Sequence, residues 1–218
     1  MKRAAVIIVL VLIGTLILWG RYEDRRLHPR EFFVEHQVPF FSQAPTGNWN
    51  GLFQNACEEA VILMVAAVRQ FPYLTPFDIE KKLIEMVRHE EQQGIGSSMT
   101  LANTQKLLKV SYGVESEMIE QPTIDVMKHY LQYRGLIVPA SGVVLANPQF
   151  RQPLPPYHMI LIIGYDDATG EFIVNDPGTR FGESYRYSYD VVMDAMHDWT
   201  GSQATILRGE KRMLVVPL

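Results

Sequence analysis

The sequence of 218 residues contains only one cysteine, Cys57. A single thiol can form no internal disulfide, and it excludes a zinc site or metal cluster built on several thiolates. The chain also lacks an excess of positive charge, with 20 Lys and Arg against 24 Asp and Glu. Neither of the glycine-rich motifs that cradle nucleotide phosphates occurs. We therefore expect no nucleic acid, nucleotide or cofactor as a partner.

What the sequence does have is a large apolar fraction. Apolar residues make up 47% of the chain and aromatic residues 11%, which excludes general disorder and is sufficient for one well-packed domain. Most of the histidines show no metal-ligand spacing with one another, and we interpret them as solvated or structural: His28, His36, His89, His129 and His197. The sequence thus predicts a globular domain without a metal site.

The amino-terminal segment is separate from this domain. Residues 4–19 are uncharged and strongly apolar, with Lys2 and Arg3 before them. As a helix they extend about 24 Å, near the lower limit for crossing a hydrocarbon core of about 30 Å. A cleaved signal peptide has a similar pattern, but no small-x-small cleavage motif follows Trp19, which favours an uncleaved anchor.

We expect a transmembrane anchor over residues 1–20, a charged linker over 21–35 and a globular domain over 36–218. Basic residues flank the apolar run on both sides, so the positive-inside bias does not fix its orientation. An anchor on a soluble-looking domain is best explained by a single pass through the cell membrane, with the domain on the extracytoplasmic side.

The first half of the domain has the periodicity of helices. In NACEEAVILMVAAVRQF, Asn55 and Glu58 fit a capping box, which places Cys57 at the second helical position, and Pro72 ends the helix. Three further helices are expected, starting at Thr75-Pro76, near Thr100 and over residues 122–135.

The second half is rich in strands. Residues 136–145 are β-rich, and MILIIGYDDATGEFIVNDP has two apolar strands joined by a turn at residues 166–170. A short helix from Ser188 to Trp199 and a closing strand, MLVVPL, follow. Helices first and an antiparallel sheet second predict an α+β domain with segregated layers.

Cys57 is the candidate nucleophile. At the start of a capped helix it lies beside unpaired backbone N–H groups and the positive end of the helix dipole, which favours the thiolate. Glu58 and Glu59 oppose this, but their side chains should point about 100° and 200° away around the helix, which keeps the penalty small if they face solvent. The alternative is a buried packing residue, because free cysteine is among the most buried residue types.

His158 is the candidate base. It begins an apolar strand directly after a stiff, proline-rich loop over residues 147–157, which we expect to line the cleft. A histidine in this position is otherwise a satisfied residue of the core or its rim.

The expected hairpin register brings an acid beside this histidine. We expect Tyr165 to pair with Glu171 across the turn. This register puts Gly178 opposite His158. Asp176 then lies two residues away on the same face of the sheet, with Cβ atoms about 7 Å apart. Its carboxylate could therefore orient the imidazole.

Nucleophilic catalysis needs a thiolate, a base, a group that orients the base, and donors for the oxyanion. The three residues above supply the first three, and a register slip of one residue would put Asn175 in place of the acid. The oxyanion donors would be the backbone N–H of Cys57 and the side chain of Gln43 or Gln54, which the residues alone do not distinguish.

Four segments, VPFFSQAPTGNW, QNACEEAVILM, YHMILIIGYDD and EFIVNDPG, occur in this order. They resemble the papain-like cysteine peptidase superfamily, in particular the domain family related to the bacteriocin-processing double-glycine leader peptidases. The resemblance runs from Val38 to the carboxyl terminus and implies a papain-like α+β fold with a central helix packed on an antiparallel sheet. It also implies Cys57 as nucleophile, His158 as base, Asp176 as orienting acid and Gln43 as oxyanion donor.

We therefore expect a membrane-anchored cysteine peptidase that hydrolyses a peptide or isopeptide bond of a peptide or protein through an acyl-enzyme. Two alternatives stay open. A transglutaminase-like acyl transferase or a cell-wall peptide hydrolase could use the same residues, and a catalytically silent module could bind a peptide in the same cleft. The silent module is suggested by Glu58 and Glu59, and the superfamily commonly has a small residue such as glycine directly after the cysteine.

Overall fold

The computed structural model describes residues 32–218 apart from residues 72 and 97. Within this described part, no helix is both long and apolar enough to cross a membrane. The anchor expected over residues 1–20 lies outside it and stays a prediction. Residues 33–35, at the end of the linker expected over 21–35, form a strand that pairs with β4 (His158–Asp166).

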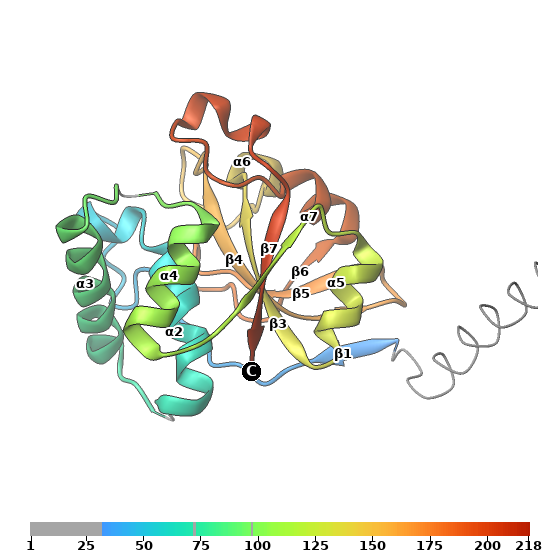
Figure 1. Ribbon diagram of the computed structural model, residues 1–218, viewed down its shortest axis with the longest axis horizontal. Coiled ribbons are helices and arrows are strands. Elements are labelled where there is room, and N and C mark those ends of the chain that lie inside the picture. Colours follow the sequence, from blue (N-terminus) through green and yellow to red (C-terminus); the bar gives the residue numbers. More distant parts are fainter. Residues whose placement is uncertain (1–31, 72, 97) are drawn as a thin grey trace, which may run out of the picture. The chain divides into compact units, whose positions relative to one another are not determined.

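The strands form one antiparallel sheet in the order β2-β7-β3-β4-β5-β6, and β1 pairs with the end of β4 (Figure 1). The antiparallel sheet expected from the sequence is confirmed. The strands are β1 (Phe33–Glu35), β2 (Glu117–Glu120), β3 (Arg134–Ala140), β4 (His158–Asp166), β5 (Glu171–Asn175), β6 (Tyr185–Ser188) and β7 (Arg212–Pro217).

The expected helix starts at Thr75 and Thr100 are confirmed, and both residues cap their helices with their side chains. The α-helices are α2 (Cys57–Gln70), α3 (Pro76–Gln92), α4 (Leu101–Tyr112), α5 (Ile124–Leu131), α6 (Gly142–Leu145) and α7 (Tyr189–Ala195), and the 3-10 helices are η1 (Gly51–Gln54) and η2 (Gln203–Arg208).

Some element boundaries differ from those expected. The strand expected over residues 136–145 ends at Ala140, and α6 occupies the rest. The helix expected to reach Trp199 ends at Ala195, because the next residue returns to the sheet and pairs with Ala140.

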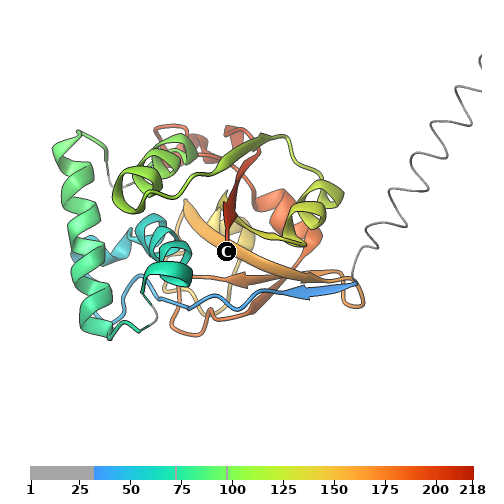
Figure 2. The ribbon, with the colours of Figure 1, turned by 60° about the horizontal axis from the view of Figure 1, so that its bottom comes forward.

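Helices cover both faces of the sheet. On one face α2 packs on β4, with α3 and α4 against α2, while α5, α6 and α7 lie on the other (Figures 1 and 2). Along β4, Met159, Leu161 and Ile163 point into the core under α2, and Ile160 and Ile162 point into the opposite core. The α+β class is therefore confirmed, but the helices are not segregated to one face.

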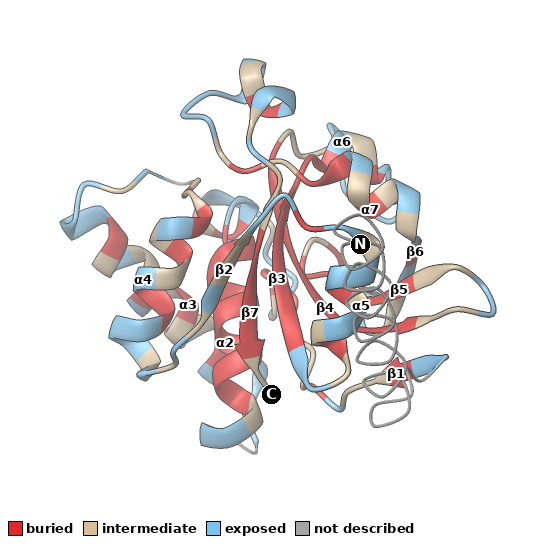
Figure 3. Cartoon of the chain, turned by 45° about the vertical axis from the view of Figure 1, so that its right-hand side comes forward, coloured by how far each residue is buried: buried red, intermediate tan, exposed pale blue. Residues whose placement is uncertain are grey.

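Helix α2 is the central helix, and it is buried from Cys57 to Ala67 (Figure 3). It begins at Cys57 with Ala56 as N-cap and without a side-chain cap, so the capping box expected from Asn55 and Glu58 is wrong. Asn55 instead ends the preceding helix η1. Cys57 is therefore the first helical residue rather than the second.

The register of the β4–β5 hairpin differs from the expected one beside the turn. There Glu171 pairs with Asp166 rather than with Tyr165, which is a difference of one residue. The expected register is therefore wrong at this end of the hairpin.

A β-bulge between Ile162 and Gly164 takes up one extra residue of β4. Beyond the bulge Leu161 pairs with Asn175, which is the pairing that the expected register requires. Because successive residues of a strand point to opposite faces, Asp176 and Asn175 are directed apart at the end of β5. The bulge thus restores the register that brings Asp176 beside His158, as expected.

Candidate active site

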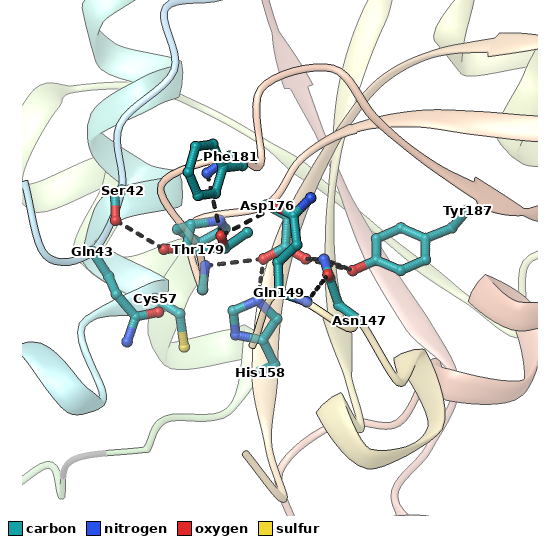
Figure 4. A network of polar contacts seen from close by, with 12 residues as sticks. Ser42, Gln43, Cys57, Asn147, Gln149, His158, Asp176, Thr179, Phe181 and Tyr187 are labelled. Carbon is teal, nitrogen blue, oxygen red and sulfur yellow. Dashed lines mark hydrogen bonds and ion pairs between the residues drawn. The ribbon is translucent and has the colours of Figure 1, made fainter. Parts of the chain in front are cut away.

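A cleft of about 470 Å³ brings the candidate residues together. It is lined by Cys57 and Glu58 from the start of α2, by His158 from the start of β4, by Gln43, and by residues 150–157 of the proline-rich loop. The expectation that this loop lines the cleft is confirmed for these residues. In Figure 4 the imidazole of His158 lies between Cys57 and the acid at the end of β5.

The carboxyl group of Asp176 is completely buried, and both of its oxygens have hydrogen-bond partners. Its Oδ1 lies 2.7 Å from Nε2 of His158 and accepts the backbone N–H of Gly178 at 2.9 Å. Its Oδ2 accepts the hydroxyl of Tyr187 at 2.5 Å and the amide of Asn147 at 3.3 Å. Burial alone would raise the pKa of Asp176, but the charge and hydrogen bond of His158, with the other donors, hold that pKa below its usual value.

The ring of His158 is fixed on several sides. Its bond to Asp176 uses Nε2, which leaves Nδ1 as the ring nitrogen outside this hydrogen bond. Phe150 packs edge-on against the ring, with centroids 5.1 Å apart. On another side a Cβ atom added to Gly178 would come within 2.8 Å of the imidazole Cε1, so only glycine fits there.

Asn175, the alternative acid partner, does not approach the imidazole. Its amide nitrogen donates to the backbone carbonyl of Val38 at 3.2 Å, and its side-chain oxygen accepts the N–H of Ser184 at 3.1 Å. The structure thus brings together His158 and Asp176 and leaves Asn175 as a link between segments of the fold.

The thiol of Cys57 is in a different electrostatic state from the expected one. Its Sγ donates to Oε2 of Glu58 at 2.8 Å, while the backbone N–H of Met159 donates to Sγ. Burial, then the charge and hydrogen bond of Glu58, and then the charge of Glu59 raise the pKa of Cys57 well above its usual value. The helix start therefore does not yield a resting thiolate.

The expectation that Glu58 and Glu59 can face solvent is also wrong, because α2 is covered on all sides. Glu58 is 1% exposed and Glu59 is 2% exposed. Oε1 of Glu58 accepts the backbone N–H of Met99 at 3.2 Å. Glu59 shares a hydrogen bond with Glu90 of α3, which is also buried. Because every residue from Cys57 to Ala67 is buried, the sequence has no amphipathic pattern here that would predict the burial of Glu58 and Glu59.

Of the two candidate glutamines, Gln43 is buried beside Cys57, and the side chain of Gln54 is exposed at the rim. The amide nitrogen of Gln43 donates to the backbone carbonyls of Phe53 at 2.9 Å and Gln54 at 3.0 Å. Its oxygen faces the cysteine (Figure 4), and no partner for that oxygen occurs in the described part of the chain.

Sequence reasoning missed part of this site. Tyr187 and Asn147, which donate to the carboxyl group of Asp176, come from β6 and from the loop after α6. No recognisable sequence motif includes either residue. Gly178 was placed opposite His158 by the expected register, and the two are in contact. Among residues 32–218, apart from 72 and 97, no group of three or more His, Cys, Asp or Glu side chains could hold a metal ion.

Residues 35–205 match the sequence profile of a family described as the Peptidase_C39 like family. This match covers more than three quarters of the chain. Among curated proteins, none matches the sequence.

The solved structures that are similar to the described domain include two peptidase structures. One is the crystal structure of a C39-like peptidase from Bacillus anthracis, with 11% identity and a TM-score of 0.54, covering 85% of this chain and 98% of that chain. The other is the peptidase domain of Streptococcus ComA, a bi-functional ABC transporter involved in quorum sensing, with 13% identity and a TM-score of 0.40, covering 86% of this chain and 100% of that chain. The first of these similarities shows a common fold.

Proposed function

We propose that this chain, which belongs to the Peptidase_C39 like family as its motifs predict, is a cysteine peptidase that hydrolyses a peptide or isopeptide bond. The observation that carries the proposal is the buried hydrogen bond of 2.7 Å between His158 and Asp176, in the same cleft as Cys57. The papain-like fold and the family support the peptidase class. The roles of the three residues are our proposal.

In the proposed reaction, Nδ1 of His158 takes the thiol proton, and the thiolate of Cys57 attacks the substrate carbonyl carbon. The C–N bond then breaks as the imidazolium returns this proton to the amine leaving group, which leaves the acyl group on Sγ as a thioester. Water gives a proton to His158, attacks the thioester and releases the acid, and the proton returns to the thiol. Asp176 keeps the N–H on Nε2 and stabilises the imidazolium.

The oxyanion needs donors on the opposite side of the carbonyl. The backbone N–H of Cys57 is at the first position of α2, where helical N–H groups have no partner within the helix. We propose the amide of Gln43 as the second donor, because it lies beside the cysteine. To donate, this amide has to exchange its bonds to the carbonyls of Phe53 and Gln54 for a bond to the oxyanion.

A second candidate function is a peptide-binding module without catalysis. The bond of the Cys57 thiol to Glu58 favours it, because a neutral thiol is a poor nucleophile. Under this hypothesis a Cys57→Ala variant binds the same peptides and keeps the biological role. We favour the peptidase because a binding module has no need of a buried carboxylate that orients a histidine.

We further propose that the apolar run at residues 4–19 anchors the protein in the cell membrane, with the domain on the extracytoplasmic side. The support is its sequence alone, an uncharged stretch of helical spanning length. Carbonate extraction of membranes and protease accessibility of intact cells test the anchor and its orientation. Release of the protein by carbonate would contradict the anchor.

Peptide cleavage is the direct test of the proposed activity. The full-length protein is incubated with a mixture of synthetic peptides, and products are identified by mass spectrometry with and without an added amine. We expect hydrolysed products from the wild type and none from Cys57→Ala. Amine adducts in place of acids would indicate acyl transfer, and identical peptide mixtures from both proteins would contradict a peptidase.

A further inference from the structure

The carboxyl group of Glu58 is held against the nucleophile from two sides. Its Oε2 accepts the thiol of Cys57 at 2.8 Å, and its Oε1 accepts the backbone N–H of Met99 at 3.2 Å, just before α4. The residue is 1% exposed, so neither oxygen can exchange its partner for bulk water without a local movement. The position of this carboxyl group is therefore set by the packing of the fold.

This arrangement has a direct consequence for the thiol. A carboxylate accepts a hydrogen bond only from the protonated sulfur, and a thiolate at the same distance would put two negative charges side by side in a buried site. The N–H of Met159 acts in the opposite sense, because it donates to Sγ. One neutral donor does not offset a full negative charge at 2.8 Å.

We infer that Glu58 is a positioning residue that holds the Cys57 thiol protonated in the resting protein, so that the thiolate forms only when this hydrogen bond is released toward His158. The inference rests on the proposed function and goes beyond it, since it assigns a latent resting state to the nucleophile. On release, the proton passes from Sγ to Nδ1 of the imidazole. The sulfur becomes the anion and the imidazole becomes the cation.

The charged and titratable groups around Glu58 agree with this role. They are Cys57 and Glu59 on its own helix, Glu90 on α3, His158 at the start of β4 and Tyr157 directly before it. Of these, only the histidine can supply a positive charge, and it does so by taking the thiol proton. Every other ionisation in this set opposes a negative sulfur.

The test is the pH dependence of Cys57 alkylation in the full-length protein, for the wild type and Glu58→Gln. Iodoacetamide labelling is followed by intact mass from pH 5 to 10, and the only cysteine of the chain makes each adduct unambiguous. Glutamine keeps the shape and the Met99 bond and can donate its N–H to the thiolate. We expect the apparent thiol pKa to fall by about one unit, which makes labelling near pH 7 about tenfold faster.

Glu59→Gln is the matched control, because it replaces a buried carboxyl group one residue away that does not contact the thiol. We expect its profile to move less than that of Glu58→Gln. Equal shifts in both variants, or no shift in Glu58→Gln, would overturn the inference. If Glu58→Gln does not fold, the ultraviolet absorbance of the thiolate in the wild type replaces it: absorbance that appears only above about pH 8.5 supports the inference, and a thiolate at neutral pH overturns it.

A parallel measurement separates this inference from the proposed function. Peptide cleavage that is lost in His158→Ala, together with an unshifted Glu58→Gln profile, would overturn the inference and leave the peptidase standing. A shifted Glu58→Gln profile in a protein whose wild type cleaves no peptide would support the effect of Glu58 on the thiol and contradict the peptidase function.

Discussion

His158 and Asp176 are joined by a hydrogen bond of 2.7 Å, although β5 ends one residue before the acid. The bulge in β4 sets this pairing, and the donors from Tyr187 and Asn147 hold the acid in place from the other side. In the proposed reaction this bond decides which imidazole nitrogen can take the thiol proton.

Replacement of Asp176 by Asn tests this role. The amide keeps the size of the side chain but loses the charge, and it can donate to the imidazole and favour the wrong tautomer. We expect peptide cleavage to fall by roughly two to four orders of magnitude with the fold intact. Kinetics and near-ultraviolet circular dichroism measure the two effects. Cleavage within threefold of the wild type would show that the acid is only structural.

A methyl group at Gly178 should move the base without touching the nucleophile. A Cβ atom there would lie 2.7 Å from Cε1 of Phe150 and 2.8 Å from Cε1 of His158. We expect Gly178→Ala to lower the cleavage rate about a hundredfold, because displacement of a catalytic group by an ångström has an effect of that order. Gly96→Ala, where an added Cβ meets nothing within 4 Å, is the control and should keep full activity. Equal rates in the two variants would argue against a role for the imidazole position.

Alanine variants of Gln43 and Gln54 form a matched pair that tests which side chain donates to the oxyanion. We expect Gln43→Ala to lower kcat by about 10² to 10³ with a smaller change in KM, since an oxyanion donor acts on the transition state. Gln54→Ala should change kcat little, because its side chain is exposed at the rim. Steady-state kinetics on a cleaved peptide give both constants. A larger loss of kcat for Gln54→Ala would reverse the assignment.

The buried pair of Glu59 and Glu90 should make stability depend on pH. Burial raises the pKa of Glu90 to about 7, whereas an unfolded glutamate titrates near 4.3. Between these values only the folded state binds the proton, so stability should fall as pH rises from about 4 to 7 and level off above. Glu90→Gln should flatten this slope in urea unfolding. Glu91→Gln, on the exposed neighbour, should flatten it much less, because the charge of Glu91 is the smallest cause of the raised pKa of Glu90. The same slope in all three proteins would contradict a proton shared by the buried pair.

Much of the fold was predictable because its signals are local. Thr75 and Thr100 cap their helices with side-chain oxygens, and threonine at such a position is a recognised sequence signal for a helix start. The apolar strands β4 and β5 are separated by a turn that contains Gly170. The start of α2 was mispredicted, because Asn55 has the right residue type for a cap but ends η1 instead.

The candidate site was predictable to the level of its central residues. Motif order and hairpin register placed His158 beside Asp176, and the register was wrong at the turn but right at the site, since the bulge is not visible in the sequence. The contact between Glu58 and the thiol could not be predicted, because it depends on α3, α4 and the sheet burying the first turn of α2. Burial by distant segments is the information that local patterns lack.

The most direct test of the central claim is acylation of Cys57 by p-nitrophenyl acetate, an activated ester that needs no specific cleft contacts. Intact mass follows the acetyl adduct, and released nitrophenolate gives its rate, for the wild type and His158→Ala at pH 7. We predict an adduct on Cys57 that forms and then hydrolyses in the wild type, and acylation at least a hundredfold slower in the variant. Equal acylation rates, or an acetyl group found elsewhere, would contradict the account.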